Sequence, residues 1–516
     1  MSPVTTEPVK PASPARPVTH SVVLIEGDGI GPEISAAVRL ILDAAAAPIA
    51  WQPAVAGGRA FAAGVGTGVP ADTVALIEQT RLVLKAPLET PVGHGGKSAN
   101  VTLRKLFEMY ANIRPVKELP GVTTPFSGRG IDLVIVRENV EDLYAGIEHM
   151  QTPDTAQALK LITRRGSAKI ARAAFELARR EGRGRVTAVH KANILKLTEG
   201  LFKRTVEAVA RDYPDINADD MIVDACAHKL VVAPEQIDVA VMTNMNGDIL
   251  SDLAAGLVGG LGLAASANIG DHAAMFEAVH GSAPDIAGRG LANPTAFLQA
   301  ALMLLRHLGE TEQAMRIEAA LALTLTEGRV LTGDLARGRG VAPSSTMAFA
   351  EAVAANLARI DMSELPVVTP AATPDAPAPR PLPGRPAPLP DRLVVETRAD
   401  TGFDLFFEVE DGDPAALGAE LTALAEATPF RLKHLSNRGT AVWPGDAART
   451  ELTPHWRARF LCRSDAAAPH ETDQGFDDAA ALALIGQIGR RYRWMHVEKL
   501  AAFNGADAFS RDQGEA

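Results

Sequence analysis

Two aspartates lie four residues apart in a segment that could bind a divalent cation. Asn244–Asp252 reads NMNGDILSD and follows the apolar run Ile237–Thr243. On a helix, Asp248 and Asp252 share one face, with about 5–6 Å between their Cβ atoms, and their charges repel unless a cation lies between them. Mg²⁺ or Mn²⁺ suits so small a set of oxygen ligands. Acids that merely favour the N-terminal end of a helix give the same pattern.

Three arginines, Arg104, Arg114 and Arg137, lie where they could bind a polyanion. Arg137 directly follows an apolar run, and an arginine at the carboxyl end of a strand points into the crevice where α/β sheets bind ligands. Arg104 belongs to an expected helix over Ser98–Tyr110, with an apolar face of Leu103, Leu106, Phe107 and Tyr110. Ser98 stands at the N-cap position, and a helix N-terminus also attracts anions. The group therefore favours bidentate binding of carboxylates.

Two further side chains are candidates for proton transfer. Lys191, in the segment HKAN, follows an expected strand and could act as a base or as a charge clamp. A surface lysine at the start of the next helix is the alternative. Tyr144, seven residues beyond Arg137, is either a proton donor or a packed aromatic residue. Asp224, in IVDACAH, is a candidate third metal ligand.

The glycine-rich segment near the N-terminus resembles a dinucleotide-binding fingerprint but fails its spacing. Glu26–Ile34 reads EGDGIGPEI, so Pro32 stands where the third glycine belongs. A proline there suits the first turn of a helix. A plain strand-to-helix turn and a direct cofactor contact both remain open for this segment.

The elements that must position these residues alternate between strands and helices. Buried strands are expected at Ser21–Glu26, Arg81–Ala86, Ile131–Val136, Val186–Val189 and Ile237–Thr243. Helices are expected at Ser167–Glu181 and Glu199–Ala210, where apolar residues recur at three and four positions. This alternation predicts an α/β fold with a largely parallel sheet flanked by helices.

The remainder of the chain divides by composition. Residues 1–20 are rich in Pro and Thr and lack the apolar core of a secretory signal, so a disordered tail is expected. Ten of the 25 residues in 366–390 are proline, which predicts an extended linker. Residues 391–516 alternate strands with two helices, near 414–427 and 479–492, and predict a small α+β domain.

Overall composition excludes several classes of function. The net charge of −11 argues against nucleic-acid binding, and no apolar run is long enough to cross a membrane. The two cysteines, Cys226 and Cys462, are far apart, which argues against a disulfide framework and favours a cytoplasmic location.

Taken together, the motifs resemble the family that contains isocitrate, isopropylmalate and homoisocitrate dehydrogenases. The segments that carry the resemblance are EGDGIGPEI, GGKSANVTLRKLFEMYANIRPVK, RENVEDLYAGIEH, HKANILK, NMNGDILSD, SANIGD and HGSAPDIAGRGLANPTA. They occur in one order between about residues 21 and 350. The C-terminal part, with TPFRLKHLSNRGT and RRYRWMHVEKL, resembles the extra domain of long bacterial isocitrate dehydrogenases of the Thermus type.

The resemblance implies a fold and an assembly. A large domain would comprise 21–109 and 259–360, and a small domain 110–258 would carry a clasp near 144–187 that joins two subunits. The active sites of such proteins borrow residues from the partner, so a homodimer or a higher homo-oligomer is implied.

The resemblance also implies roles for individual residues. Arg104, Arg114 and Arg137 would bind the substrate carboxylates, with Ser98 and Asn100 at the γ-carboxylate. Asp248, Asp252 and the partner subunit's Asp224 would hold Mg²⁺ or Mn²⁺. Tyr144 and the partner's Lys191 would transfer protons, with Asp224 as a relay and Asn193 near the substrate. The cofactor-binding residues would be His280, Gly281, Asp285, Ile286 and Asn293.

The substrate and the cofactor follow from particular positions. Polar Ser98 and Asn100 suit the third carboxylate of isocitrate rather than the apolar tail of isopropylmalate. Homoisocitrate is harder to exclude, because it is longer by one methylene, which changes the binding free energy by only about 1–3 kcal/mol. Asp285 should repel a 2′-phosphate, so NAD is expected over NADP. Ala233 and Gly333, which replace an arginine and a tyrosine of NADP-type relatives, favour the same choice.

The expected activity is therefore oxidation and decarboxylation of isocitrate, as in the tricarboxylic acid cycle. The alternatives are NADP preference, homoisocitrate or isopropylmalate as substrate, and a regulatory subunit without catalysis. A regulatory subunit would require the loss of a ligand or of a proton-transfer residue, and the sequence has all of them. For the C-terminal domain, strengthening of subunit assembly and binding of an effector both remain open.

Overall fold

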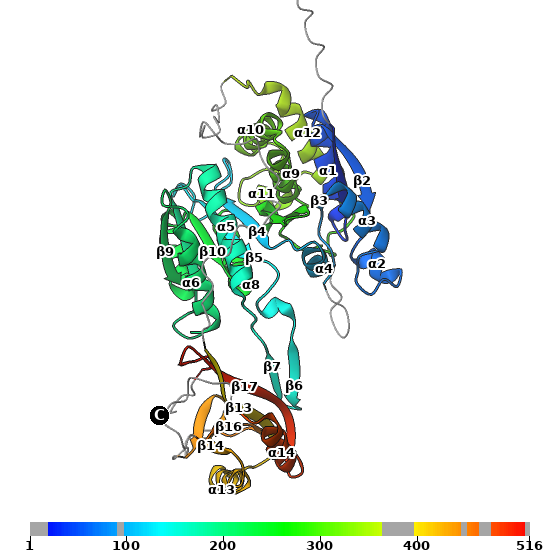
Figure 1. Ribbon diagram of the computed structural model, residues 1–516. Coiled ribbons are helices and arrows are strands. Elements are labelled where there is room, and N and C mark those ends of the chain that lie inside the picture. Colours follow the sequence, from blue (N-terminus) through cyan, green and yellow to red (C-terminus); the bar gives the residue numbers. More distant parts are fainter. Residues whose placement is uncertain (1–18, 90–97, 364–396, 445–450, 464–475, 511–516) are drawn as a thin grey trace, which may run out of the picture.

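The computed structural model describes residues 19–89, 98–363, 397–444, 451–463 and 476–510. The predicted linker 366–390 and nearly all of the predicted tail 1–20 lie outside these residues. The described strands form sheets of ten, six and two strands. Figure 1 shows how the labelled elements are arranged in space. Within the described residues, no helix is both long enough and apolar enough to cross a bilayer.

The ten-stranded sheet has the order β2-β1-β3-β12-β11-β4-β5-β10-β8-β9. Its strands are β1 (His20–Ile25), β2 (Ile49–Ala54), β3 (Leu82–Lys85), β4 (Ala111–Lys117), β5 (Asp132–Glu138), β8 (Arg185–His190), β9 (Asn217–Ile222), β10 (Val239–Met242), β11 (Ala265–Ile269) and β12 (Ala274–Ala278). Both ends of the sheet are parallel, and β11 and β4 in the middle pair antiparallel with their neighbours. The predicted strands and the largely parallel sheet are confirmed.

Helices cover the two ends of this sheet. Around β1, β2 and β3 lie α1 (Gly31–Ala44), α9 (Thr295–Leu308), α10 (Thr311–Glu327) and α12 (Thr346–Asn356). Around β5, β8, β9 and β10 lie α5 (Arg164–Glu181), α6 (Thr198–Ala210), α7 (Val223–Val232) and α8 (Asn244–Leu257). Apolar runs such as that of β10 are completely buried, because helices remove both faces of a parallel sheet from water.

The junction between the two ends of the sheet is narrow. β11 and β4 pair over only three residue pairs, Ala267 with Ile113, Asn268 with Asn112 and Ile269 with Ala111. The amides of Asn112 and Asn268 are buried there, and Asn112 Nδ2 donates to Asn268 Oδ1 at 2.8 Å.

Two smaller sheets complete the described chain. The hairpin of β6 (Glu148–Thr152) and β7 (Thr155–Ala158) extends from the end of the large sheet that contains β5 and β10 toward the C-terminal domain. That domain contains β13 (Arg398–Glu408), α13 (Pro414–Ala425), β14 (Phe430–Asn437), β15 (Thr440–Trp443), β16 (His455–Cys462), α14 (Asp478–Gly489), β17 (Arg493–Phe503) and β18 (Ala506–Asp507). Its sheet is antiparallel, so the predicted α+β architecture is confirmed. The hairpin contacts it where His496 Nδ1 lies 3.2 Å from Gln151 Oε1.

The helix expected over 98–110 is shorter than predicted. It forms α4 (Ala99–Leu106), and Glu108 then adopts a φ of +46°, which turns the chain into β4. Leu106 was expected on the apolar face but is 56% exposed. Phe107 and Tyr110 are buried as expected, although they lie beyond the end of the helix.

Candidate functional site

The two predicted metal-binding aspartates lie on α8, which starts directly after β10. Arg114 Nη1 donates to Asp252 Oδ1 at 3.0 Å, and Arg114 Nη2 lies 3.4 Å from Asp248 Oδ1. Asp248 also accepts bonds from Arg137 and from the Tyr144 hydroxyl. The structure therefore brings Asp248, Asp252, Arg114, Arg137 and Tyr144 together at one place.

Close packing brings Arg137 to α8. A Cβ added to Gly247 would lie 2.5 Å from Arg137 Cγ, so only glycine allows this approach. Arg137 is 1% exposed, and its Nε and Nη2 donate to Asn244 Oδ1 at 3.0 and 2.8 Å. Burial, with repulsion from Arg114 and Arg104, lowers the pKa of Arg137 to about 10. Three mutually repelling guanidinium groups favour the binding of a polyanion.

The pKa values of the carboxylates and of the phenol at this place are shifted in different directions. Burial raises the pKa of Asp248, but Arg137 and the Tyr144 hydroxyl outweigh burial, so that this pKa lies below its usual value. Burial raises the pKa of Asp252, with Arg114 opposing and Asp248 adding to the effect. Burial and the bond to Asp248 raise the pKa of Tyr144, which keeps the phenol protonated.

Lys191 and Asp224 form a separate pair. Lys191 Nζ donates to Asp224 Oδ1 at 2.5 Å, and this bond holds the pKa of Asp224 below its usual value. Their side chains are 33% and 68% exposed, and Asn193 is exposed in the turn that follows Lys191. Within the described residues of one chain, no three His, Cys, Asp or Glu side chains gather as metal ligands.

The donor set nevertheless fits a hard divalent cation. Asp248 and Asp252 supply carboxylate oxygens from one helix face, and their side chains are 35% and 50% exposed, so water and a chelating substrate can reach them. Mg²⁺ commonly binds through one or two carboxylates with its remaining ligands from water and substrate.

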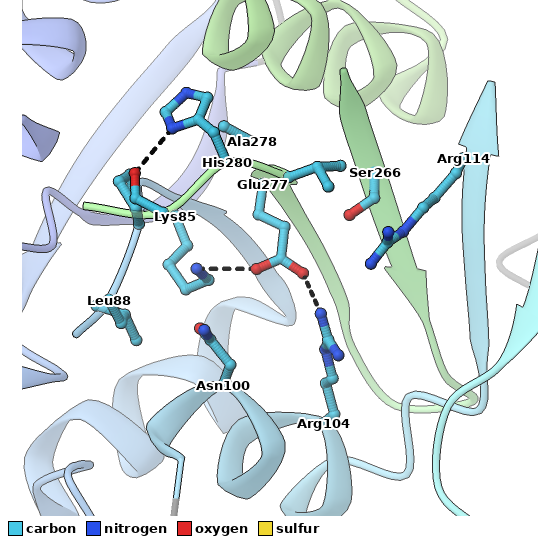
Figure 2. Close-up of a pocket in the computed structure, with 12 residues that line it drawn as sticks. Lys85, Leu88, Asn100, Arg104, Arg114, Ser266, Glu277, Ala278 and His280 are labelled. Carbon is cyan, nitrogen blue, oxygen red and sulfur yellow. Dashed lines mark hydrogen bonds and ion pairs between the residues drawn. The ribbon is translucent and has the colours of Figure 1, made fainter. Parts of the chain in front are cut away.

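A cavity of about 120 Å³ lies next to this cluster, between α4, β3, β11 and β12. Figure 2 shows the Glu277 carboxylate between the Lys85 ammonium and the Arg104 guanidinium, each 2.8 Å away. Burial raises the pKa of Glu277, but Lys85 and Arg104 outweigh it, so that this pKa lies far below its usual value.

Several polar atoms that line this cavity have no hydrogen-bond partner among the described residues. They are Asn100 Oδ1, Arg104 Nε, Ser266 Oγ and His280 Nε2. His280 Nδ1 bonds to the Gly281 carbonyl at 3.0 Å, and burial lowers the pKa of His280, so the ring is neutral and Nε2 is an acceptor. Buried polar groups are normally paired, so these atoms fit a polar ligand.

The remaining predicted cofactor residues lie on the loop that follows β12. Gly281 and Asp285 are exposed and Ile286 is partly buried. Asn293 Nδ2 donates to Asp334 Oδ2 at 2.8 Å. Arg289 was not predicted, and its Nη1 lies 3.4 Å from the Asp285 carbonyl oxygen. A positive side chain therefore stands beside Asp285.

The glycine-rich segment forms a turn against this loop. Gly27 and Gly29 have φ of +69° and +58°, and Ile30 N donates to the Ser282 carbonyl at 2.9 Å. A Cβ at Gly29 would lie 2.0 Å from that carbonyl oxygen. The segment is thus a strand-to-helix turn whose glycines permit the close approach. Ser98 is at the N-cap position of α4, but its hydroxyl does not cap the described first turn.

Sequence reasoning missed Lys85, Ser266 and Glu277. Lys85 and Glu277 each interrupt an otherwise apolar strand, LVLK and AMFEA. A charged residue in a buried strand is rare unless it is paired, and this was the available signal.

Two family models, several relatives and a solved structure match this chain. The isocitrate/isopropylmalate dehydrogenase family matches residues 21–353, and the bacterial isocitrate dehydrogenase C-terminal domain matches 398–515. An isocitrate dehydrogenase [NADP] of Thermus thermophilus is 52% identical over 96% of both chains. One of Rickettsia bellii, with the same name, is 36% identical over 96% of this chain and 99% of its own. The crystal structure of the TT0538 protein from Thermus thermophilus superimposes with a TM-score of 0.85, at 51% identity and 96% coverage of both chains.

These comparisons correct the expected cofactor. The relatives that match along nearly the whole chain are named as NADP-dependent, whereas relatives named as NAD-dependent match about 61% of the chain. The expectation of NAD is therefore wrong by this comparison. It rested on Asp285, Ala233 and Gly333 and left out Arg289, whose Nη1 lies 3.4 Å from the Asp285 carbonyl oxygen and adds a positive charge at this loop.

Proposed function

Because the chain belongs to the isocitrate/isopropylmalate dehydrogenase family, we propose that it oxidises isocitrate and decarboxylates the product to 2-oxoglutarate and CO₂, with reduction of NADP. The observation that carries the proposal is the cluster of Arg114, Arg137 and Tyr144 around Asp248 and Asp252. It joins binding groups for several carboxylates with ligands for a divalent cation.

The arginines bind and orient the substrate. Arg114 and Arg137 are nearly completely buried, so their ion pairs with substrate carboxylates form in a medium of low dielectric constant and are strong. Arg104 adds a third guanidinium at the boundary with the cavity. Ser98 and Asn100, at the start of α4, would meet the γ-carboxylate. These polar groups would remain unpaired against the apolar tail of isopropylmalate, which disfavours that substrate.

Asp248 and Asp252, together with the partner subunit's Asp224, would hold Mg²⁺ or Mn²⁺. Such an ion, when bound, lowers the pKa of the substrate hydroxyl and stabilises the negative charge that develops on that oxygen. Around it, Arg114 and Arg137 limit the repulsion between the two carboxylates in each chain.

Tyr144 and Lys191 would move the protons. Because the pKa of Tyr144 is raised, its hydroxyl is protonated at neutral pH and can donate a proton to C3 after CO₂ leaves. The partner subunit's Lys191 would accept the proton of the C2 hydroxyl, with Asp224 as its relay. In this chain those two residues are already bonded to each other.

Sharing of residues requires at least a homodimer, and the surface near the site supports one. Three exposed apolar residues of α8, Met245, Ile249 and Leu253, recur every four positions beside the metal-binding aspartates. Ile194 is also exposed, in the turn that follows Lys191. Contiguous exposed apolar surface marks an interface between proteins.

The cavity beside Glu277 and the loop after β12 would receive NADP. Of the unpaired polar atoms of the cavity, Ser266 Oγ would meet the nicotinamide half, whereas His280, Gly281, Ile286 and Asn293 would meet the adenosine half. Arg289 would pair with the 2′-phosphate.

Steady-state kinetics with isocitrate and Mg²⁺ test the proposal. A higher kcat/KM for NADP than for NAD is expected, with no turnover once Mg²⁺ is chelated. A higher value for NAD would overturn the cofactor assignment, and faster turnover of isopropylmalate or homoisocitrate would overturn the substrate. Arg289→Ala should raise the KM for NADP and leave the KM for isocitrate unchanged, with Arg306→Ala as the surface control.

A further inference from the structure

A buried ionic group at the base of the hairpin has no part in the chemistry described above. It consists of Asp142, Lys160 and Glu199. Both carboxylates are 0% exposed and the Lys160 side chain is 15% exposed. The Lys160 ammonium bonds to Asp142 and lies 2.9 Å from Glu199 Oε1. Because buried charges are costly unless they are paired, three such residues together call for an explanation.

Asp142 connects the proton donor to the metal-binding helix. Its Oδ1 accepts the backbone N–H of Leu143 at 2.8 Å, and its Oδ2 accepts that of Met245 at 2.9 Å. Leu143 begins the short turn η1 (Leu143–Ala145), which carries Tyr144. Met245 is in the first turn of α8, where Thr243 at the N-cap makes no capping bond with its own side chain. Asp142 therefore caps α8 from outside and fixes Tyr144 relative to it.

Glu199 connects the same helix to the segment of Lys191. Its Oε2 accepts the backbone N–H of Lys191 at 3.0 Å, and its Oε1 accepts the Thr243 hydroxyl at 3.1 Å. Lys191 is thus held by its backbone to Glu199 while its ammonium bonds to Asp224. Only Lys160 joins the carboxylates of Asp142 and Glu199 to each other among the ion pairs of the described residues.

We propose that Lys160 is a positioning residue, which fixes Tyr144, the start of α8 and the Lys191 segment in one arrangement. This inference rests on the proposed function, in which Tyr144 serves the site of its own subunit and Lys191 serves the site of the partner. Through Lys160, each chain holds the proton donor of one active site and the base of the other in register. The group acts by charge, because the Lys160 ammonium pairs with both buried carboxylates.

Replacement of the ammonium by an apolar group tests the proposal. Lys160→Met leaves Asp142 and Glu199 to repel each other, and displacement of catalytic groups by about 1 Å costs on the order of a hundredfold in rate. We expect kcat to fall by about tenfold to a hundredfold and the KM for isocitrate to change little, because the three substrate-binding arginines make no contact with the group. Lys160→Arg should retain most of the activity.

Lys169→Met is the matched control. Lys169 is also a lysine with little exposure, 14%, and with two acidic partners, Glu108 at 3.2 Å and Asp271 at 3.6 Å. It touches none of the three segments. Its kcat should stay near that of the wild type. An equal loss of kcat in both variants would assign Lys160 a merely structural role and overturn the proposal.

A second substitution separates charge from packing. In Lys160→Met/Glu199→Gln, the neutral amide can still accept the Lys191 N–H but no longer repels Asp142. We expect the kcat of the double variant to be at least about threefold higher than that of Lys160→Met, because removal of both partners of an ion pair costs less than removal of one. A double variant that is slower than Lys160→Met contradicts the proposal.

Amide hydrogen exchange tests the linkage without any assay of activity. In Lys160→Met, exchange should accelerate together in 142–146, 191–200 and 243–248, and in Lys169→Met it should not. Faster exchange in only one of these segments would overturn the linkage. If the wild type fails to oxidise isocitrate, the proposed function is wrong, and the exchange measurement still decides whether Lys160 joins the segments.

Discussion

Arg137 and Arg114 lie against the carboxylates of α8, so that each charge in the site compensates another. Burial lowers the pKa of both arginines, and repulsion from Arg104 adds to it, while their proximity keeps Asp248 ionised. A polyanionic substrate relieves the repulsion among the arginines. Divalent metal relieves that between the aspartates. Binding of substrate and of metal should therefore favour each other.

Loss of one aspartate should weaken metal binding. Asp248→Asn removes a charged oxygen ligand and leaves Arg137 without its carboxylate. Loss of an outer-shell partner of a metal ligand typically lowers metal affinity about 10–100-fold. Because Asp248 is a proposed direct ligand, we expect the dissociation constant of Mn²⁺ to rise at least about tenfold. Titration calorimetry in the presence of isocitrate measures this. Asp215→Asn, at an exposed pair with Arg179, is the control, and equal affinity in both variants would contradict the metal site.

Glu277 should contribute to stability only while it is ionised. Glu277→Gln leaves Lys85 and Arg104 buried without their shared carboxylate, and breaking such a pair costs about 3–5 kcal/mol in unfolding free energy. The pKa of Glu277 is lowered in the folded state. Its contribution is thus complete above the ordinary glutamate pKa of about 4.3 and is lost as pH falls toward the lowered value.

Urea unfolding of the wild type and of Glu277→Gln at several pH values checks this prediction. The difference in unfolding free energy should be largest near pH 7 and should shrink in acid. Glu235→Gln, at an exposed pair with Arg129, should cost less than about 1 kcal/mol. A difference that grows as the pH falls would contradict the assigned direction.

At the scale of elements, the sequence predicts those strands and helices whose apolar residues follow a regular pattern. The five predicted strands of the large sheet, β1, β3, β5, β8 and β10, are short apolar runs, because helices cover both faces there, and their positions followed from this pattern. The other five strands were not predicted, and one of them, β9, is polar and largely exposed. The end of α4 did not follow. Phe107 and Tyr110 continue a helical spacing, but Glu108 turns the chain with a positive φ, and tertiary contacts rather than the helix bury both aromatic rings.

The site was predictable where a motif places its residues near each other in sequence. Asp248 and Asp252 needed only helical spacing. Lys85 and Glu277 pair across β3 and β12, which are distant in sequence, so no local pattern joins them. Lys160 and Glu199 were missed for the same reason, because their pairing depends on how the hairpin returns to the sheet.

The exposed face of α8 should hold the subunits together. Ile249 is 57% exposed, and Ile249→Lys would bury an unpaired charge in the proposed interface. We expect this variant to dissociate into monomers and to lose activity, since neither Lys191 nor Asp224 then reaches a partner's site. Analytical ultracentrifugation measures the assembly. Val55→Lys, at a residue 43% exposed beyond β2, should remain associated, and an active monomeric Ile249→Lys would contradict shared sites.

At the scale of the whole molecule, the arrangement of residues predicts complementation between inactive subunits. Tyr144→Phe and Lys191→Met should each be nearly inactive alone. In a heterodimer, one of the two sites receives an intact Tyr144 from the Lys191→Met chain and an intact Lys191 from the Tyr144→Phe chain. Random mixing of the two chains by co-expression should therefore restore up to about a quarter of the wild-type activity. No recovery in a mixture shown to contain heterodimers would mean that each chain builds its own site.

The three residue pairs between β11 and β4 restrict how the two ends of the large sheet can move relative to each other. Arg114 Nε donates to Asn112 Oδ1, and Asn268 Nδ2 donates to Glu277 Oε1, so the short ladder also joins Arg114 to the cavity that Glu277 lines. Pulling the halves apart would break buried amide bonds, whereas rotation about so short a ladder costs little. We therefore expect the two ends of the sheet to turn about this pairing when ligands enter, and a carboxylate bound by Arg114 would be linked to Glu277 through Asn112 and Asn268.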